Sequence, residues 1–207
     1  MAFPPEVALA TKNPGKIEEI WRICSDWPVR QWHFGRSLAD PSRVSRLWPD
    51  VEETGETYLD NARLKAHAVA KAVGIPSLAD DSGIEVDALG GAPGPRSARF
   101  AGPDATDHEN LHLLIGRVRE VPPDKRTARY RCVAVCAWPD GSEVAGEGDC
   151  EGTLILEPRG TGGFGYDPVF VPVGERRTMA ELAPEEKDAI SHRGRAFRVL
   201  GEILARA

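Results

Sequence analysis

Strand-like and helix-like segments are mixed along this chain without a strict strand–helix–strand repeat. Residues 7–10 form a short apolar run, and residues 129–137 form a longer one that is typical of a strand. Residues 59–73 instead carry apolar side chains at helical spacing. Helices interleaved irregularly with strands indicate a mixed sheet that is flanked by helices. The sequence therefore predicts the α/β class.

Polar residues mark the ends of several predicted helices. Thr57 is suited to cap a helix that ends near Gly74, and the residue at its capping-box position is acidic. Thr106 and Glu109 form a capping box before the next helix, and Ser191 is suited to cap the last one. The chain thus contains at least three helices with defined starts.

Two strand predictions concern residues of chemical interest. Residues 76–79 predict a strand that ends at Asp80, with extended structure resuming at 84–87. Residues 129–137 and 142–156 predict a hairpin around a Pro-Asp-Gly turn. We therefore expect the acidic Asp-Asp-Ser-Gly segment to form a turn at a strand end.

Composition restricts the partners of this chain. Its 207 residues suit one domain, or two lobes that share a core, and 41% of them are hydrophobic. A net charge of −6 argues against a nucleic acid polymer or an anionic membrane as the partner. No apolar run reaches the ~20 residues that span a bilayer. The N-terminus lacks the basic region of a signal peptide, so we expect a cytoplasmic protein.

The four cysteines include no Cys-x-x-Cys pair. Cys132 and Cys136 lie four residues apart in a predicted strand, so both side chains point to the same face. Free cysteines in such positions are usually buried. The cysteines are therefore predicted to be buried thiols and not zinc ligands.

Residues 11–16, Thr-Lys-Asn-Pro-Gly-Lys, connect a predicted strand to a predicted helix. Backbone amides at a helix N-terminus together with a lysine favour binding of a phosphate. The spacing is not that of a Walker loop, and Asn-Pro-Gly is also a common turn. The segment alone is compatible with a phosphate site or with a plain turn.

Acidic residues cluster around Glu53 and at Asp80-Asp81. Adjacent carboxylates on a strand face opposite sides, so one can bind a cation while its neighbour orients the backbone. Mg²⁺ prefers one or two protein carboxylates together with water and phosphate oxygens. Asn61 and Lys65 lie one helical turn apart and could face a polyphosphate. A solvated turn with a surface polar pair is the alternative.

The glycine-rich run 160–168 contains Phe164 and Asp167. An aromatic ring that stacks on a base, next to an acceptor for ring N–H groups, is a common way to hold a purine. Residues 191–194, Ser-His-Arg-Gly, follow Lys187 closely and add three potential donors. Core aromatics and an ordinary surface His-Arg pair are the alternatives.

Taken together and in this order, the motifs resemble those of the inosine triphosphate pyrophosphatase family, also called XTP/dITP diphosphatases. The matching stretches cover nearly the whole chain: ATKNPGK at 10–16, EETGETYLDNARLKA at 52–66, LADDSGIEVDALGGAPGPRSARFAG at 78–102, GTGGFGYDPVF at 160–170 and ELAPEEKDAISHRG at 181–194. Residues 37–50 depart from the family because they are longer and rich in Trp, Arg and Pro, which could reshape the rim of the cleft.

The resemblance implies a single two-lobed α/β domain over residues 1–207, with an elongated mixed β-sheet flanked by helices and an active site in the cleft between the lobes. It also implies a homodimer, for which the apolar Trp21 and Trp48 give slight additional support. The implied activity is Mg²⁺-dependent hydrolysis of ITP, dITP and XTP to the monophosphate and pyrophosphate. Such an enzyme removes non-canonical purine nucleoside triphosphates from the nucleotide pool.

The resemblance also implies roles for individual residues. Asp81 would be the general base and a metal ligand, with Glu53 as a further ligand and Asp80 in support. The residues that would contact the phosphates are Thr11, Lys12, Asn13, Pro14, Gly15, Lys16, Lys65 and Ser82. The residues that would bind the base are Phe164, Gly165, Tyr166 and Asp167, with Lys187, His192 and Arg193 reading its 6-position.

Three other functions are alternatives to this one. A nucleotide-binding regulator would not need to keep both Asp81 and Glu53. A Maf-like pyrophosphatase acting on pyrimidine substrates would not be expected to contain the Ala-Asp-Asp-Ser-Gly and Ser-His-Arg-Gly motifs. A structural or interaction protein would have no reason to concentrate Lys, Asp and Gly in three separate loops.

Overall fold

A computed structural model describes residues 3–33 and 48–206 of the chain. The chain divides into two compact units, and each is assembled from segments that are distant in the sequence. Unit 1 comprises Met1–Asp81, Cys132–Gly148 and Arg193–Ala207, and unit 2 comprises Ser82–Arg131 and Asp149–His192. Most of the unusual segment 37–50 lies outside the described residues.

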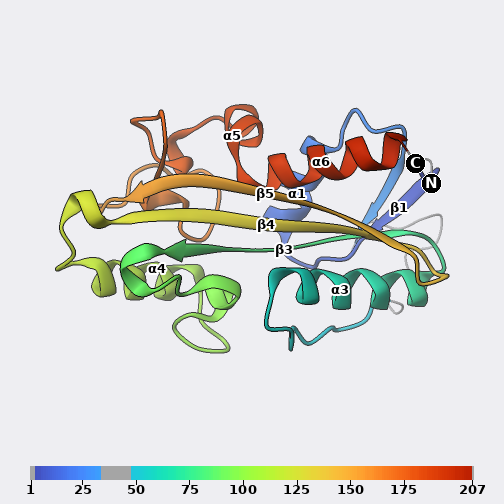
Figure 1. Cartoon of the computed structure of the whole chain (residues 1–207), viewed down its shortest axis with the longest axis horizontal. Coiled ribbons are helices and arrows are strands. Elements are labelled where there is room, and N and C mark those ends of the chain that lie inside the picture. The colour runs from blue at the N-terminus through green and yellow to red at the C-terminus, as the bar shows by residue number, and fades with distance from the viewer. Residues whose placement is uncertain (1–2, 34–47, 207) are drawn as a thin grey trace. The chain divides into compact units, whose positions relative to one another are not determined.

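Six strands in the described part of the chain form one mixed sheet, with the order β2-β1-β3-β4-β5-β6 (Figure 1). β1 pairs in parallel with both β2 and β3, whereas β5 and β6 are antiparallel. The strands are β1 (Glu6–Leu9), β2 (Arg30–His33), β3 (Ser77–Val86), β4 (Thr127–Ala137), β5 (Glu143–Leu154) and β6 (Phe170–Pro172). The predicted α/β class with a mixed sheet is confirmed, and β4 and β5 form the predicted hairpin.

The helices begin and end largely where the capping residues indicate. Thr57 accepts a hydrogen bond from the backbone of Asp60 at 3.1 Å, and Gly74 ends the helix with φ of 76°. Thr106 and Glu109 form the predicted capping box. The α-helices in the described residues are α1 (Pro14–Ile23), α3 (Tyr58–Val73), α4 (Asp107–Val118), α5 (Pro184–Ile190) and α6 (His192–Arg206).

The expected turn at Asp80 is wrong, because β3 runs without a break from Ser77 to Val86. β1 ends at Leu9, opposite Leu78, but β4 continues along the other edge of β3 and keeps the strand extended. Gly83 marks a close approach of backbones here and not a turn. A Cβ at Gly83 would lie 2.3 Å from the carbonyl oxygen of Gly94.

Unit 1 buries apolar side chains on both faces of its part of the sheet. On one face, Ile20 of α1 and Phe197 of α6 pack against Leu9. On the other face, the alanine-rich side of α3 packs against the strands, with Ala66 fully buried. Figure 1 shows α6 and α3 on opposite sides of the strands. All four cysteines are buried thiols, as predicted.

Unit 2 has its own core, in which Leu114 of α4 packs with Ile84 of β3 and Phe170 of β6. Only one of the two tryptophans expected to support a dimer is exposed. Trp48 is only 5% exposed and packs into the core of unit 1, whereas Trp21 is 37% exposed. Among the described residues, no helix is long and apolar enough to cross a bilayer.

Candidate active site

The predicted phosphate segment connects β1 to α1 in unit 1. Asn13 is the N-cap of α1 and accepts a hydrogen bond from the backbone N–H of Lys16 at 3.0 Å. Pro14 occupies the first helical turn, where its fixed φ suits the helix. Thr11 accepts a hydrogen bond from the backbone of Asn13 at 3.2 Å. The segment is therefore a folded turn at a helix N-terminus, the position that favours an anion.

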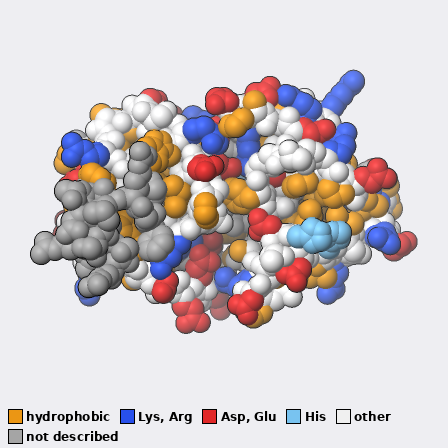
Figure 2. Space-filling model, turned by 180° about the vertical axis from the view of Figure 1, so that it is seen from behind, with side chains coloured by type: hydrophobic (Ala, Val, Ile, Leu, Met, Phe, Trp, Pro, Cys, Tyr) orange, Lys and Arg blue, Asp and Glu red, His pale blue; other side chains and the backbone are white. Residues whose placement is uncertain are grey.

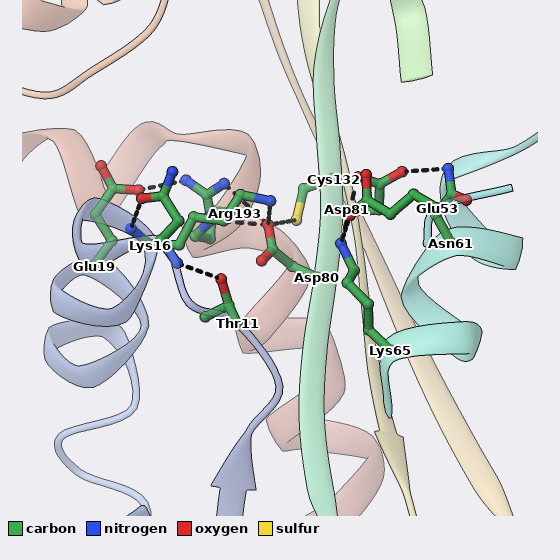
Figure 3. A network of polar contacts seen from close by, with 11 residues as sticks. Thr11, Lys16, Glu19, Glu53, Asn61, Lys65, Asp80, Asp81, Cys132 and Arg193 are labelled. Atoms are coloured by element: carbon green, nitrogen blue, oxygen red, sulfur yellow. Dashed lines mark hydrogen bonds and ion pairs between the residues drawn. The ribbon is translucent and has the colours of Figure 1, made fainter. Parts of the chain in front are cut away.

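Asp80 points to the α1 and α6 side of β3 and is surrounded by cations (Figure 3). Its carboxylate oxygen Oδ2 lies 3.0 Å and 3.1 Å from two nitrogens of the Arg193 guanidinium. The same oxygen lies 3.3 Å from Nζ of Lys16, and the thiol of Cys132 is 3.9 Å away. Arg193 also bonds to Glu19 of α1. The four charged groups form a buried network without net charge.

This network fixes the charge state of Asp80. Burial alone would raise the pKa of the Asp80 carboxyl, but the charges of Lys16, Arg193 and Lys65 outweigh it and hold that pKa well below its usual range. Burial likewise opposes the charge on Arg193, but Asp80 and Glu19 raise the pKa of its guanidinium. The network therefore favours the ionised form of Asp80, and this carboxylate in turn positions Lys16 and Arg193.

Asp81 points to the opposite face of β3, toward α3, as the alternation of side chains in a strand requires (Figure 3). Its carboxylate accepts a hydrogen bond from the Asn61 side chain at 3.1 Å and lies 3.7 Å from Nζ of Lys65. Lys65 also bonds to Glu53. The Asn61 side chain accepts a hydrogen bond from the backbone of Gly55 at 2.8 Å. Asn61 thereby joins Asp81 to the loop that carries Glu53.

The electrostatic environment of Asp81 differs from that of Asp80. Burial and the nearby Glu53 raise the pKa of the Asp81 carboxyl above its usual value, although Lys65, Lys16 and Asn61 act against the rise. Burial lowers the pKa of Lys65, but Asp81 and Glu53 raise it by more. A carboxylate with a raised pKa is a stronger proton acceptor, which suits a general base.

The donor set at Asp81 and Glu53 fits Mg²⁺. The described part of the chain holds no group of three or more His, Cys, Asp or Glu side chains that could bind a metal ion alone. Mg²⁺ does not need one, because it binds one or two protein carboxylates and takes its other oxygens from water and substrate phosphates. Asp81 and Glu53, which converge on Lys65, supply two such carboxylates.

In unit 2, the glycine-rich loop is built around the buried carboxylate of Asp167. One oxygen accepts hydrogen bonds from the backbone N–H of Phe164 at 2.9 Å and from Nζ of Lys187 at 2.6 Å. The other accepts from the hydroxyl of Tyr130 at 3.2 Å. Gly163 is required here, because a Cβ at this position would lie 2.0 Å from the Asp167 carboxylate.

The predicted base-binding side chains of unit 2 lie close to this carboxylate. Nζ of Lys187 lies 5.1 Å from the centre of the Phe164 ring, a cation–π contact. The ring of His192 stacks on Tyr130 with the ring centres 4.5 Å apart. Phe164, Asp167, Lys187 and His192 therefore belong to one cluster of side chains in unit 2.

Two other residues of the loop have structural roles. The Tyr166 side chain is buried, and its hydroxyl donates a hydrogen bond to the carbonyl of Ser97 at 2.8 Å. The ring of Tyr166 thus belongs to the core of unit 2. The backbone N–H of Gly165 donates to the Asp107 carboxylate of α4 at 3.0 Å. Asp107 therefore holds the loop in place.

Arg193 is positioned differently from its sequence-predicted role in reading the base. It is only 1% exposed, and its guanidinium is bonded to Asp80 and Glu19 in unit 1, whereas Lys187 and His192 belong to unit 2. Moving it to a base would break a buried ion pair. The geometry favours a positioning role for Arg193.

Sequence reasoning missed four residues that shape these sites: Glu19, Tyr130, Cys132 and Asp107. A signal existed for Tyr130 and Cys132, because they lie at every second position together with Ala134 and Cys136 and so share one face of β4. Glu19 is buried beside Ile20 in α1, and nothing in the local sequence distinguishes it from an exposed glutamate.

Comparison with known proteins identifies the family. The sequence pattern of the Ham1 family matches residues 7–203, so the chain belongs to this family. A protein of Streptomyces coelicolor named dITP/XTP pyrophosphatase is 50% identical, with 95% of each chain covered. A protein of Escherichia coli strain K12 with the same name is 45% identical, with 96% of this chain and 98% of that protein covered.

Solved structures of similar proteins support the same family. The structure of a HAM1 protein from Coxiella burnetii matches with a TM-score of 0.83 at 38% identity and covers 100% of both chains. A Mycobacterium abscessus protein described as a nucleoside-triphosphatase and dITP/XTP pyrophosphatase matches with a TM-score of 0.71 at 39% identity, with 94% of this chain and 98% of that chain covered. The family resemblance drawn from the motifs is confirmed.

Proposed function

We propose that this protein hydrolyses dITP, ITP and XTP to the nucleoside monophosphate and pyrophosphate with the help of Mg²⁺. The observation that carries the proposal is the environment of Asp81. It is a buried carboxylate with a raised pKa, beside Glu53, Lys65 and Asn61, on the strand whose opposite face holds Lys16 and Asp80. The names of the relatives from Streptomyces coelicolor and Escherichia coli support dITP and XTP as substrates.

In the proposed reaction, a water molecule attacks the α-phosphorus of the nucleotide and gives its proton to the Asp81 carboxylate. The bond to the α,β-bridging oxygen breaks, and its electron pair leaves with pyrophosphate. Lys16 and Lys65, which lie beside Asp80 and Asp81, would balance the charge that develops on the phosphates. Asn61 keeps Asp81 oriented by donating to its second oxygen.

Asp81 and Glu53 would hold the Mg²⁺ ion, and the turn from Thr11 to Lys16 would bind phosphate oxygens. When bound, the ion supplies a Lewis acid that stabilises negative charge on the phosphates and makes water more acidic. Ser82 follows Asp81 directly in β3, so its hydroxyl lies on the face that Asp80 occupies.

We assign the base to the cluster in unit 2. Phe164 offers a ring for stacking, and Lys187 and His192 offer donors that suit a 6-oxo group. Adenine presents an amino donor at that position, so any N–H group of Lys187 or His192 that faces the base would find no acceptor there, at a cost of about 1–3 kcal/mol each. This difference favours hypoxanthine and xanthine over adenine.

A pyrophosphate-release assay tests the proposal. We expect rapid release from XTP, dITP and ITP with Mg²⁺, slow release from ATP, GTP and dTTP, and no release in excess EDTA until Mg²⁺ is restored. Binding without release would indicate a nucleotide sensor. Preference for dTTP or UTP would indicate a Maf-like enzyme, and full activity in EDTA would exclude the metal.

The homodimer and the cytoplasmic location remain predictions. A monomer of this chain has a mass of 22.5 kDa, so light scattering at micromolar concentration distinguishes the two states. Trp48 is buried within unit 1, so the predicted interface is expected to use Trp21 without it.

A further inference from the structure

A pair of histidines lies on the exposed side of α4 in unit 2, apart from every residue assigned above to catalysis or base binding. His108 and His112 are four residues apart, which places their side chains on the same face of the helix. Both are exposed. Figure 2 shows histidine side chains gathered on the face that it draws, with acidic side chains beside them.

The two imidazole rings lie close enough for one ion to reach both Nε2 atoms. Their Nε2 atoms lie 3.0 Å apart, and the ring centres are 4.2 Å apart with a tilt of 51°. Two nitrogens that bind one ion at about 2.0–2.1 Å, at an angle between 90° and 109°, lie about 2.9–3.4 Å apart. The observed separation therefore allows both Nε2 atoms to bind the same ion with little movement.

We propose that His108 and His112 form a binding site for a first-row transition metal ion such as Ni²⁺ or Zn²⁺, with water in the remaining positions. Imidazole nitrogen prefers these ions to Mg²⁺, which prefers oxygen. The site is thus chemically distinct from the carboxylate pair of Asp81 and Glu53. The four cysteines do not compete for the ion, because all of them are buried.

The helix α4 holds the two histidines on a well-anchored backbone. α4 begins with a complete capping box at Thr106 and Glu109, and Leu111 and Leu114 anchor its inner face in the core of unit 2. The two histidines therefore project from a fixed backbone. Little conformational freedom of the backbone is lost when the ion binds.

The pair could instead be joined by a hydrogen bond between one protonated and one unprotonated Nε2 atom, because such a bond has the same length. Metal binding separates the two arrangements. A chelate needs a lone pair on both Nε2 atoms, so each ring must carry its proton on Nδ1. Removing either histidine then leaves a single ligand.

The test is calorimetric titration of the untagged chain with Ni²⁺ at about pH 8, because protons compete with a metal ion for its nitrogen ligands. Excess Mg²⁺ is present throughout to occupy the oxygen ligands. We expect one Ni²⁺ to bind per chain, and His108→Ala or His112→Ala to weaken binding at least about tenfold because the chelate is lost. His67→Ala and Glu53→Gln are the controls, and both should bind Ni²⁺ as the wild type does.

A second measurement locates the ion. Paramagnetic Ni²⁺ at substoichiometric amounts should broaden the ring proton signals of His108 and His112 first among the five histidines. The same signals should be unaffected by Mg²⁺. No binding by the wild type, equal affinity in either alanine variant, or broadening that begins at other histidines would overturn the proposal. None of these readouts depends on nucleotide hydrolysis, so the result is independent of the proposed function.

Discussion

The two faces of β3 give opposite properties to two adjacent aspartates. Asp80 faces Lys16 and Arg193, and these cations hold the pKa of its carboxyl well below the usual value. Asp81 faces a single lysine together with Glu53, and its pKa is raised because burial dominates. Residue type is the same on both faces, so the difference comes from the helices and the loop that pack on each side.

This difference separates two tasks that one carboxylate could not perform together. A carboxylate held by an arginine and a lysine has a fixed position and a fixed charge, but it is a poor proton acceptor. A carboxylate whose charge is less well compensated accepts a proton or binds a cation more readily. We therefore assign structure to Asp80 and chemistry to Asp81.

The largest effect is expected for Asp81→Asn. The variant lacks the general base and one ligand for Mg²⁺, so turnover of XTP should fall by about 10²–10⁴-fold. Stability should be unchanged or higher, because the fold disfavours the ionised form of Asp81. Steady-state kinetics and a urea titration measure the two quantities. Near-normal turnover would remove Asp81 from the chemistry.

Asp80→Asn should instead lower the free energy of unfolding. It leaves Lys16 and Arg193 in a buried site with only Glu19 to compensate them, and breaking such a network costs about 3–5 kcal/mol of folding stability. Urea unfolding measures this loss, and Asp104→Asn on an exposed residue is the control. A loss no larger than in the control would show that the two aspartates do not differ.

Arg193→Lys tests whether the guanidinium belongs to the Asp80 network or to the base. Lysine keeps the charge but cannot donate from two fixed nitrogens to the same Asp80 oxygen, so a modest loss of activity is expected, about tenfold. The loss should be in equal proportion for XTP and ATP, because Arg193 contacts neither base. Measured kcat/KM values for both nucleotides decide this. A selective loss for XTP would restore the role in base reading that the sequence motif predicts.

Local sequence rules predicted the features that depend on neighbouring residues. Capping residues gave the ends of α3 and the start of α4, and strand alternation gave the opposite orientations of Asp80 and Asp81. The motifs also indicated the family. The helix ends and the alternation of side chains depend on residues within a few positions along the chain.

Features that depend on distant partners could not be predicted in this way. The Asp-Asp-Ser-Gly segment has the composition of a turn, but pairing with β4 keeps it extended. Arg193 lies 113 residues from Asp80 and 174 from Glu19 in the sequence, so its ion pairs have no local signal. His192 and Arg193 are adjacent, yet successive helical residues point about 100° apart, and the two side chains join different clusters.

The smallest expected effect concerns the thiol of Cys132, which lies 3.9 Å from the Asp80 carboxylate. Burial, and then the charge of Asp80, raise the pKa of this thiol, so it stays protonated and can donate a weak hydrogen bond. Cys136 is the matched control, because it is buried on the same face of β4 and its pKa is raised to about 12 by burial alone. Cys132→Ala and Cys136→Ala remove the same atoms from the same core. Their costs in unfolding free energy should therefore differ by the contact with Asp80, about 0.5–1.5 kcal/mol.

In the background of Asp80→Asn that difference should shrink, because the acceptor has lost its charge. Equal costs in the otherwise wild-type protein would show that Lys16, Arg193 and Lys65 stabilise the Asp80 carboxylate without a contribution from the Cys132 thiol.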